Sequence, residues 1–361
     1  MRHLVISRGV VERVVTLARE RKRQSAPSPE LAKLRSEIVK VSKETQGQMG
    51  LYMNHIESGT SMAIDADKIF PLGGVFKLAV MVETYRQIDA GMISMDERIE
   101  LETHHYCIGE GLLQYMQTGL KPTVHDLLAM MIIGTDNTAS EMLWKRIGIQ
   151  RVNMLIHDLG LARTSIYMPY RESFLMSMGY GPYKDLSIPE AARKWKGLSD
   201  IERMNALNET EREAANLSIE EFRKKYESIY GVRAQKRLKT QRIYDEVFDN
   251  FGTPREIGVL LEKIVRHEVV SPKACEMMLS LLMRQQSTAS MSYLISPEIP
   301  VALKSGDTAF SVANAGVIYV SSKSHVVLCC FFKNMLEGKK AILAEAKIAS
   351  LVYDFFSRAR S

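Results

Sequence analysis

The sequence has few cysteines, and their placement excludes two classes of protein. Only four of the 361 residues are cysteine, and their spacing fits no zinc-site pattern. The four are Cys107, Cys275, Cys329 and Cys330. The last two are adjacent in an apolar run, where neighbouring strand side chains point to opposite faces, so we expect both to be small buried hydrophobes. A reduced, intracellular protein is the simplest expectation, rather than a disulfide-linked scaffold.

Long apolar runs are also missing. No stretch approaches the roughly 18 consecutive apolar residues of a membrane span. The N-terminus lacks the continuous apolar core of a signal peptide, because Arg8, Glu12 and Arg13 interrupt it. Apolar residues within 10–17 instead mark one face of an amphipathic helix. We therefore expect a cytoplasmic protein with no membrane span and an N-terminal helical extension over residues 1–28, which docks on its own domain or on a partner.

A nucleic-acid motif and a sustained run of lysine or arginine are absent too, although the formal net charge is +6. This excess charge is expected to be spread over solvated helix faces, so we predict no nucleic-acid partner. The chain is 46% hydrophobic and 25% charged, which is ordinary for a soluble protein with a sizeable core.

Strand patterns fall near the two ends of the chain, and helical patterns fill its middle. Residues 49–65 indicate two strands around a turn, and residues 301–334 indicate three more. This order predicts an α+β fold, in which an antiparallel sheet built from both ends is flanked by helices and an all-helical domain is inserted between them. We assign residues 29–72 and 250–361 to the sheet domain and residues 73–249 to the helical domain.

One segment of the helical domain differs from the rest. Residues 184–248 are rich in lysine, arginine and glutamate and contain few large apolar residues. They predict a charged helical insertion that forms no deep core by itself, with Trp195, Met204 and Leu207 spaced for packing between helices. We interpret the insertion as a lid, an arm, or a surface for a homo-oligomer or a protein partner.

Three short motifs carry the candidate chemistry. Residues 70–77 (FPLGGVFK) open a helix, residues 135–137 (TDN) lie between two apolar helices, and residues 304–306 (KSG) lie on a strand. In this order and on these elements, they resemble the Ser-x-x-Lys, Ser-Asp-Asn and Lys-Thr-Gly motifs of serine β-lactamases and penicillin-binding proteins, with the class A branch as the best match. The resemblance covers about residues 30–178 and 250–361, and it implies a β-lactamase/transpeptidase-like fold.

The resemblance also implies a role for each matching residue. Lys77 matches the helix lysine that takes the proton of the nucleophile. Thr135 matches the loop hydroxyl that shuttles a proton, and Asn137 matches the amide that holds the substrate. Lys304 and Ser305 match the cation and the hydroxyl that bind the substrate carboxylate. The implied partner is a small-molecule carboxylate, either a β-lactam or a peptide-like ligand.

Two further parts of the chain match the family, the first fully and the second in part. Gly306 keeps the strand backbone free for close approach. Residues 172–176 (ESFLM) resemble the family's Glu-x-x-Leu-Asn, with methionine in place of asparagine. In the family that glutamate activates the deacylating water, which would assign Glu172 the same role. The alternative is a loop carboxylate paired with Arg171 or another cation. No cofactor and no metal are implied, since the family's chemistry uses side chains alone.

The chain departs from the family at the nucleophile, because Gly74 occupies the position of the serine. Glycine has no nucleophilic group, and removing such a group costs most of the catalytic rate. The replacement is either natural or engineered. Cys107, near His104 and His105, is an alternative nucleophile, but an unreactive loop cysteine is the simpler interpretation. Adjacent histidines usually point apart, which argues against a metal site there.

Four functions are compatible with these residues. The first is a penicillin-recognising pseudoenzyme that senses, sequesters or scaffolds. The second is an active enzyme in which Glu172 or Lys77 acts as a general base without an acyl-serine. The third is a class A β-lactamase that carries an engineered Ser-to-Gly change. The fourth is an interaction module whose binding surface is the insertion. We favour a β-lactamase-like protein with lost or altered acylation.

Overall fold

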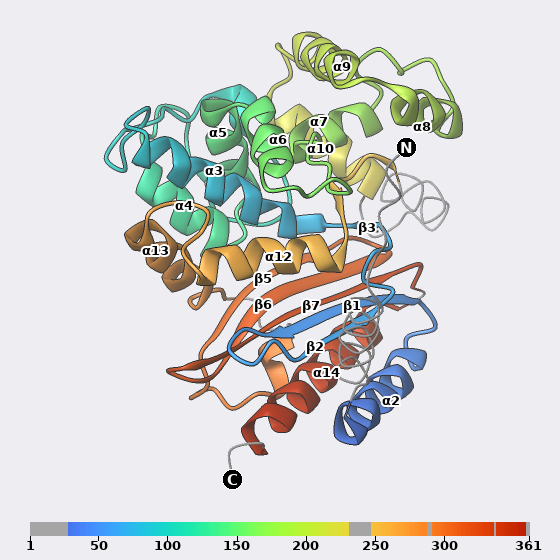
Figure 1. Cartoon of the computed structure of the whole chain (residues 1–361). Coiled ribbons are helices and arrows are strands. Elements are labelled where there is room, and N and C mark those ends of the chain that lie inside the picture. The colour runs from blue at the N-terminus through green and yellow to red at the C-terminus, as the bar shows by residue number, and fades with distance from the viewer. Residues whose placement is uncertain (1–27, 231–246, 287–290, 336, 359–361) are drawn as a thin grey trace, which may run out of the picture.

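A computed structural model describes residues 28–230, 247–286, 291–335 and 337–358 of the chain (Figure 1). The N-terminal helical extension that we expected lies, except for its last residue, outside this part of the chain. None of the helices in these ranges is both long and apolar enough to cross a membrane.

A five-stranded antiparallel sheet forms the centre of one half of the molecule, in the order β2-β1-β7-β6-β5 (Figure 1). Its strands are β1 (Gln48–His55), β2 (Ser61–Ile64), β5 (Val301–Asp307), β6 (Ser311–Ser321) and β7 (Ser324–Lys333). Strand β1 pairs with β7 along its whole length, so the sheet joins the two ends of the chain. This confirms the predicted α+β fold.

Helices cover both faces of the sheet (Figure 1). Helix α12 (Pro254–Val265) packs on one face, and α14 (Gly338–Arg358) packs on the other beside α2 (Pro29–Lys43). The two faces form separate apolar clusters. Cys329 belongs to the cluster under α12 and Cys330 to the one under α14, as their adjacent positions on a strand predict.

The helical domain surrounds α3, and ten of that helix's 13 residues are buried. A helix with apolar residues on every face is stable only in the middle of a domain, and the neighbouring helices supply that cover. Helix α13 joins this domain to the sheet, since it packs against both α3 and β5. The helices are α3 (Lys77–Asp89), α4 (Val124–Ile133), α5 (Asn137–Ile147), α6 (Ile149–Asp158), α7 (Tyr170–Ser177) and α13 (Pro272–Leu282).

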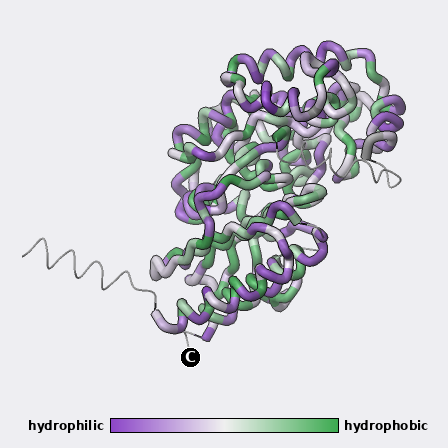
Figure 2. Tube along the Cα trace, turned by 90° about the vertical axis from the view of Figure 1, so that its right-hand side faces the viewer, coloured by the Kyte–Doolittle hydropathy of each residue, from purple (hydrophilic) through white to green (hydrophobic). Residues whose placement is uncertain are grey.

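The described part of the insertion forms three helices, α8 (Ile188–Gly197), α9 (Asp200–Glu213) and α10 (Ile219–Tyr230). Helices α8 and α9 lie at the top of Figure 1, and α10 lies below them, next to α7. Trp195 and Leu207 are buried, and Met204 packs against the same small cluster. This confirms that the three residues serve helix packing. Figure 2 shows apolar residues concentrated inside the sheet region and the helical domain, with polar residues along the outer helices.

A short two-stranded ladder returns the chain from the insertion to the first motif. Strand β3 (Phe70–Pro71) pairs with β4 (Phe251–Gly252) just before the glycine pair. The remaining short elements are the 3₁₀ turns η1 (Gly73–Phe76), η2 (Thr103–His105), η3 (Leu113–Tyr115) and η5 (Met291–Leu294). The ladder places the end of the insertion beside the candidate site.

Candidate active site

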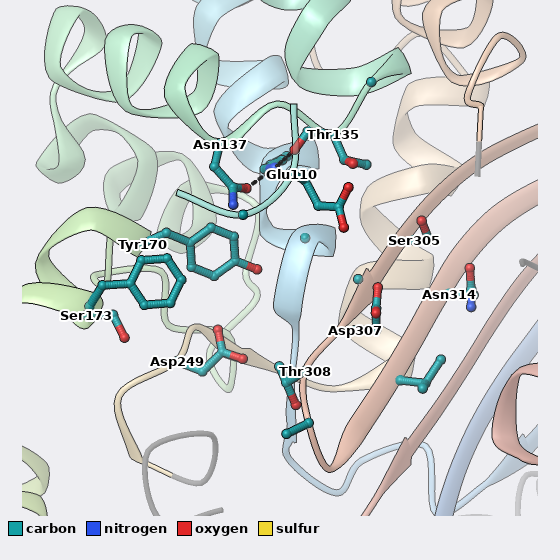
Figure 3. Close-up of a pocket in the computed structure, with 18 of the residues that line it drawn as sticks. Glu110, Thr135, Asn137, Tyr170, Ser173, Asp249, Ser305, Asp307, Thr308 and Asn314 are labelled. Carbon is teal, nitrogen blue, oxygen red and sulfur yellow. Dashed lines mark hydrogen bonds between the residues drawn. The ribbon is translucent and has the colours of Figure 1, made fainter. Parts of the chain in front are cut away.

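A cavity of about 590 Å³ opens between the sheet and the helical domain, and all three motifs reach it (Figure 3). Grooves between domains are a common place for ligand sites. The residues of the predicted site that line this cavity are Gly74, Lys77, Thr135, Asn137, Ser305 and Gly306. Two of the predicted site residues, Lys304 and Glu172, do not belong to its lining.

The glycine pair allows the start of the first helix to touch strand β5. Gly73 has a φ of +46°, which glycine adopts without strain. A Cβ at Gly74 would lie 2.8 Å from the carbonyl oxygen of Ser305 and 3.6 Å from Nζ of Lys304. Position 74 therefore faces the third motif, and its backbone is in van der Waals contact with the strand.

Lys77 opens α3 and is completely buried by surrounding residues, although its end reaches the cavity. Its Nζ donates hydrogen bonds to the carbonyl oxygen of Thr135 at 2.5 Å and to Oδ1 of Asn137 at 2.8 Å. Burial lowers the pKa of Lys77 from 10.5 to about 8, and the negative charge of Asp136 limits this shift. A lysine with such a pKa can take up a proton near neutral pH, as general-base catalysis requires.

The second motif is fixed by its middle residue. Asp136 caps α5 by accepting a hydrogen bond from the backbone N–H of Ala139 at 2.9 Å. Its other oxygen accepts from the N–H groups of Leu112 at 2.7 Å and Leu113 at 2.8 Å. Thr135, before it, has a φ of +51°, which is unusual for a β-branched residue. The bonds of Asp136 to Leu112 and Leu113 thus hold the loop that carries Glu110 beside the cavity.

The third motif lies on β5 with its cation turned away from solvent. Lys304 is fully buried, and its Nζ donates to the carbonyl oxygen of Ser305 at 2.9 Å. Burial holds the pKa of Lys304 well below its usual range, and the charge of Lys77 lowers it further. The hydroxyl of Ser305 accepts from Nε2 of Gln285 at 2.7 Å and so keeps its own proton to donate into the cavity. A Cβ at Gly306 would lie 2.3 Å from the backbone nitrogen of Gly74.

Glu172 lies in a buried charged cluster behind the cavity wall. Burial, followed by the charge of Glu141, raises the pKa of Glu172 well above its usual range. Lys145 places its Nζ 3.9 Å from Glu172 Oε1 and 2.8 Å from Glu211 Oε1, and Arg171 also binds Glu211, at 3.2 Å. Both cations thus bind the insertion's Glu211 more closely than Glu172. The role of Glu172 as a catalytic base stays a prediction.

Three acidic residues that line the cavity were not predicted from the sequence: Glu110, Asp249 and Asp307 (Figure 3). Asp249, directly after the insertion, accepts a hydrogen bond from the N–H of Gly73 at 3.2 Å. Asp307 directly follows the third motif, so its place could have been noticed in the sequence. The position of Asp249 depends on how the chain returns from the insertion, for which the sequence offers no local signal.

An aromatic wall, formed by Tyr170, Phe174 and Tyr226, closes one side of the cavity. Tyr170 and Phe174 lie one turn apart on α7, with ring centroids 6.2 Å apart. Tyr226 comes from α10 of the insertion and packs edge-to-face on Phe174 at 5.1 Å. The insertion therefore contributes directly to the cavity.

Cys107 is unsuited to the role of an alternative nucleophile. It is fully buried, and burial raises the pKa of its thiol well above the usual range, which disfavours the reactive thiolate. The rings of His104 and His105 lie 4.0 Å apart, and burial lowers the pKa of His105 to about 3. Within the described ranges, no group of His, Cys, Asp and Glu side chains is arranged to hold a metal ion.

The solved structures with this fold include three relatives of the expected kind. One is a β-lactamase from Sphaerobacter thermophilus DSM 20745, with 18% identity, a TM-score of 0.65, and coverage of 89% of this chain and 96% of that one. A variant of PBP-A, in an acyl-enzyme complex with penicillin G, has 19% identity, a TM-score of 0.66, and coverage of 91% and 97%. A Ser-to-Gly variant of the TLA-1 extended-spectrum β-lactamase has 17% identity, a TM-score of 0.64, and coverage of 90% and 99%.

At these identities the structural likeness establishes the β-lactamase/transpeptidase-like fold alone. No curated protein sequence matches the chain. The model of a β-lactamase enzyme family, however, matches residues 33–356. Because this match spans most of the sequence, the chain belongs to the β-lactamase enzyme family.

Proposed function

We propose that the cavity binds a β-lactam or a peptide-like carboxylate and that the protein forms no acyl-enzyme at position 74. The observation that carries this proposal is the convergence of Gly74, Lys77, Asn137 and Ser305 on one cavity. The polar groups suited to hold such a ligand are in place, whereas the nucleophile is missing. A protein of this kind senses or sequesters its ligand, or acts as a scaffold.

The cavity would recognise a carboxylate through hydrogen-bond donors, because the two lysines of the motifs have lowered pKa values and carry no permanent positive charge. The Ser305 hydroxyl has a free proton to donate, and Lys77 reaches the cavity with its ammonium group. A ligand carboxylate beside Lys77 and Lys304 would raise the depressed pKa of both groups and draw a proton into the site. Penicillin G is the ligand in the acyl-enzyme complex of the PBP-A variant, which makes penicillins the first ligands to test.

A second candidate function is hydrolysis without an acyl-serine, with Lys77 as the general base on a water molecule. The pKa of Lys77, lowered to about 8 by burial, favours this alternative. Glu172 is less suited to this role, because it does not line the cavity and burial raises its pKa. The engineered-serine alternative is decided by the Gly74→Ser variant described below. A Cβ at Gly74 would lie 2.8 Å from the Ser305 carbonyl oxygen, so a serine there requires a local shift of the strand backbone.

The insertion is proposed as part of the site rather than as an independent interaction module. It supplies Tyr226 and Phe248 to the cavity lining, and Asp249 follows it directly in the chain. An additional surface on it for a protein partner or a second copy of the chain is compatible with this role.

The proposal is tested with a panel of penicillins and cephalosporins. We expect calorimetry to detect binding to the native chain, intact mass to detect no adduct, and absorbance to detect no ring opening. The variant Gly74→Ser should gain an adduct of the ligand's mass, and Gly74→Ala, which adds the Cβ without the hydroxyl, should gain none.

The other outcomes decide between the alternatives. Ring opening by the native chain, lost in Lys77→Met, would establish the second candidate function. The absence of binding to the native chain across the whole panel would refute the proposed ligand class.

A further inference from the structure

A second cavity, of about 350 Å³, lies beside the first, since the two share a lining residue. It is formed between helices α8 and α9 of the insertion and the segment that precedes α7. Asp249 lines both cavities and is the only acidic residue among the described residues that line the second. The second cavity contains none of the motif residues.

Three basic side chains surround this second cavity: Arg163, Lys196 and Arg203. The guanidinium of Arg163 donates to the backbone carbonyl of Asp67 at 2.5 Å, and its charge, after that of Arg255, helps to lower the pKa of the Asp67 carboxyl. The carboxylate of Asp249 accepts hydrogen bonds from the backbone N–H groups of Gly73 and Asn250. Among the described residues, the lining therefore carries an excess of positive charge.

Arg203 is the best-placed of these cations. Its guanidinium lies 5.5 Å from the ring centroid of Tyr167 and 5.9 Å from that of Trp195, so aromatic rings hold it in position. Within the described part of the chain, its ion pair with Asp200 of its own helix spans 3.8 Å. Its Nε is buried and has no hydrogen-bond partner within the described residues. A buried donor without a partner is costly, and a bound anion would satisfy it.

The remaining wall is apolar. Trp195 and Met168 are buried, and Val247 and Phe251 complete the surface beside them. Lys196 is exposed at the rim, one residue after Trp195. A flat apolar body packed on Trp195 would thus bring an anionic head within reach of Arg203 and Lys196.

We propose that the second cavity binds a small aromatic carboxylate, with its ring on Trp195 and its charge between Arg203 and Lys196. This site is separate from the proposed β-lactam cleft and does not depend on it. Planar carboxylates suit a guanidinium because two parallel hydrogen bonds form.

Calorimetry on the full chain tests this site with three probes that share one ring system: 2-naphthoate, 2-naphthalenemethanol and 2-naphthylmethylamine. We expect 2-naphthoate to bind saturably with one molecule per chain, and the neutral and cationic probes to bind at least about tenfold more weakly. Salt should weaken the binding of 2-naphthoate, since the rim charges are exposed.

Variants locate the binding. Arg203→Gln should raise the Kd for 2-naphthoate about tenfold and Lys196→Gln about threefold. Lys194→Gln is the matched control, because this lysine lies exposed on the same helix and does not line the cavity. Lys196 is also exposed, so its variant is informative even if Arg203→Gln fails to fold by circular dichroism.

Three results would overturn the inference. They are the absence of saturable binding of 2-naphthoate up to its solubility limit, equal binding of the neutral alcohol, and binding that Lys196→Gln weakens no more than Lys194→Gln does.

Discussion

The Cβ that Gly74 lacks would point at the carbonyl oxygen of Ser305, and the nearest side-chain group to it is the ammonium of Lys304. In place of a nucleophile, the cleft therefore has a close contact between a helix start and a strand. Lys77 remains beside this contact, buried and bonded to the second motif. Its ionisation has an energetic cost that is measurable without any ligand.

The buried lysine predicts how stability depends on pH. The pKa of Lys77 is about 8 in the folded protein and about 10.5 when unfolded, so between these values the unfolded chain binds more protons. The penalty is complete below pH 8 and is relieved as the pH rises toward 10.5. Removing it with Lys77→Met should stabilise the protein by up to about 3 kcal/mol more at pH 7 than at pH 10.5.

Urea denaturation of both proteins across this pH range measures the difference. Lys68→Met, which removes an exposed lysine, is the control and should show no such trend. A difference between Lys77→Met and the native chain that is constant from pH 7 to pH 10.5 would contradict the prediction.

At the scale of elements, the aromatic wall shows how helix α10 acts on the cleft. Tyr226 touches Phe174 of α7, and both rings line the cavity. The wall is therefore shared between the body of the protein and the insertion. An aromatic wall of this kind suits a ligand with an apolar side chain, such as a penicillin, better than it suits a purely polar ligand.

Truncating this wall should weaken ligand binding. Tyr226→Ala is expected to raise the Kd for penicillin G about tenfold, through lost aromatic packing. The control is Tyr180→Ala, because Tyr180 contacts Lys225 of the same helix but does not line the cavity. Calorimetry with penicillin G measures both, and an equal loss of affinity in the two variants would show that the wall has no specific role.

The elements themselves were predictable because their signals are local. Thr253 before Pro254 marks the start of α12, and short runs rich in apolar residues mark β5 to β7. The convergence of the three motifs followed from their order and from the family resemblance. The environment of Glu172 was not predictable, because Glu211, which draws its cations away, is contributed by a distant helix of the insertion.

At the scale of the whole molecule, the insertion is closely connected to the helical domain. Its Glu211 binds Lys145 and Arg171, and its apolar side chains share a cluster with Met168 and Met176. It is consequently a part of the folded unit and not an appended arm. Its removal should affect both stability and the cleft.

Replacing residues 184–246 with a short Gly/Ser linker tests this connection. We expect a fall in Tm of roughly 5 °C or more, because Arg171 and Glu172 lose their cover and a buried charge loses its partner. Affinity for penicillin G should fall as well, since Tyr226 is lost. Calorimetric scanning and binding measure the two effects. An unchanged Tm together with an unchanged Kd would instead identify the insertion as an independent module.

Asp249 forms a shared partition between the two cavities, and its carboxylate also accepts a hydrogen bond from Gly73, next to the missing nucleophile. A ligand that moves this side chain alters the shape of both compartments at once. Thermodynamic reciprocity then requires that an occupant of either compartment change the affinity of the other by the same factor. If a ligand moves Asp249, the two ligand concentrations therefore become inputs to a single equilibrium.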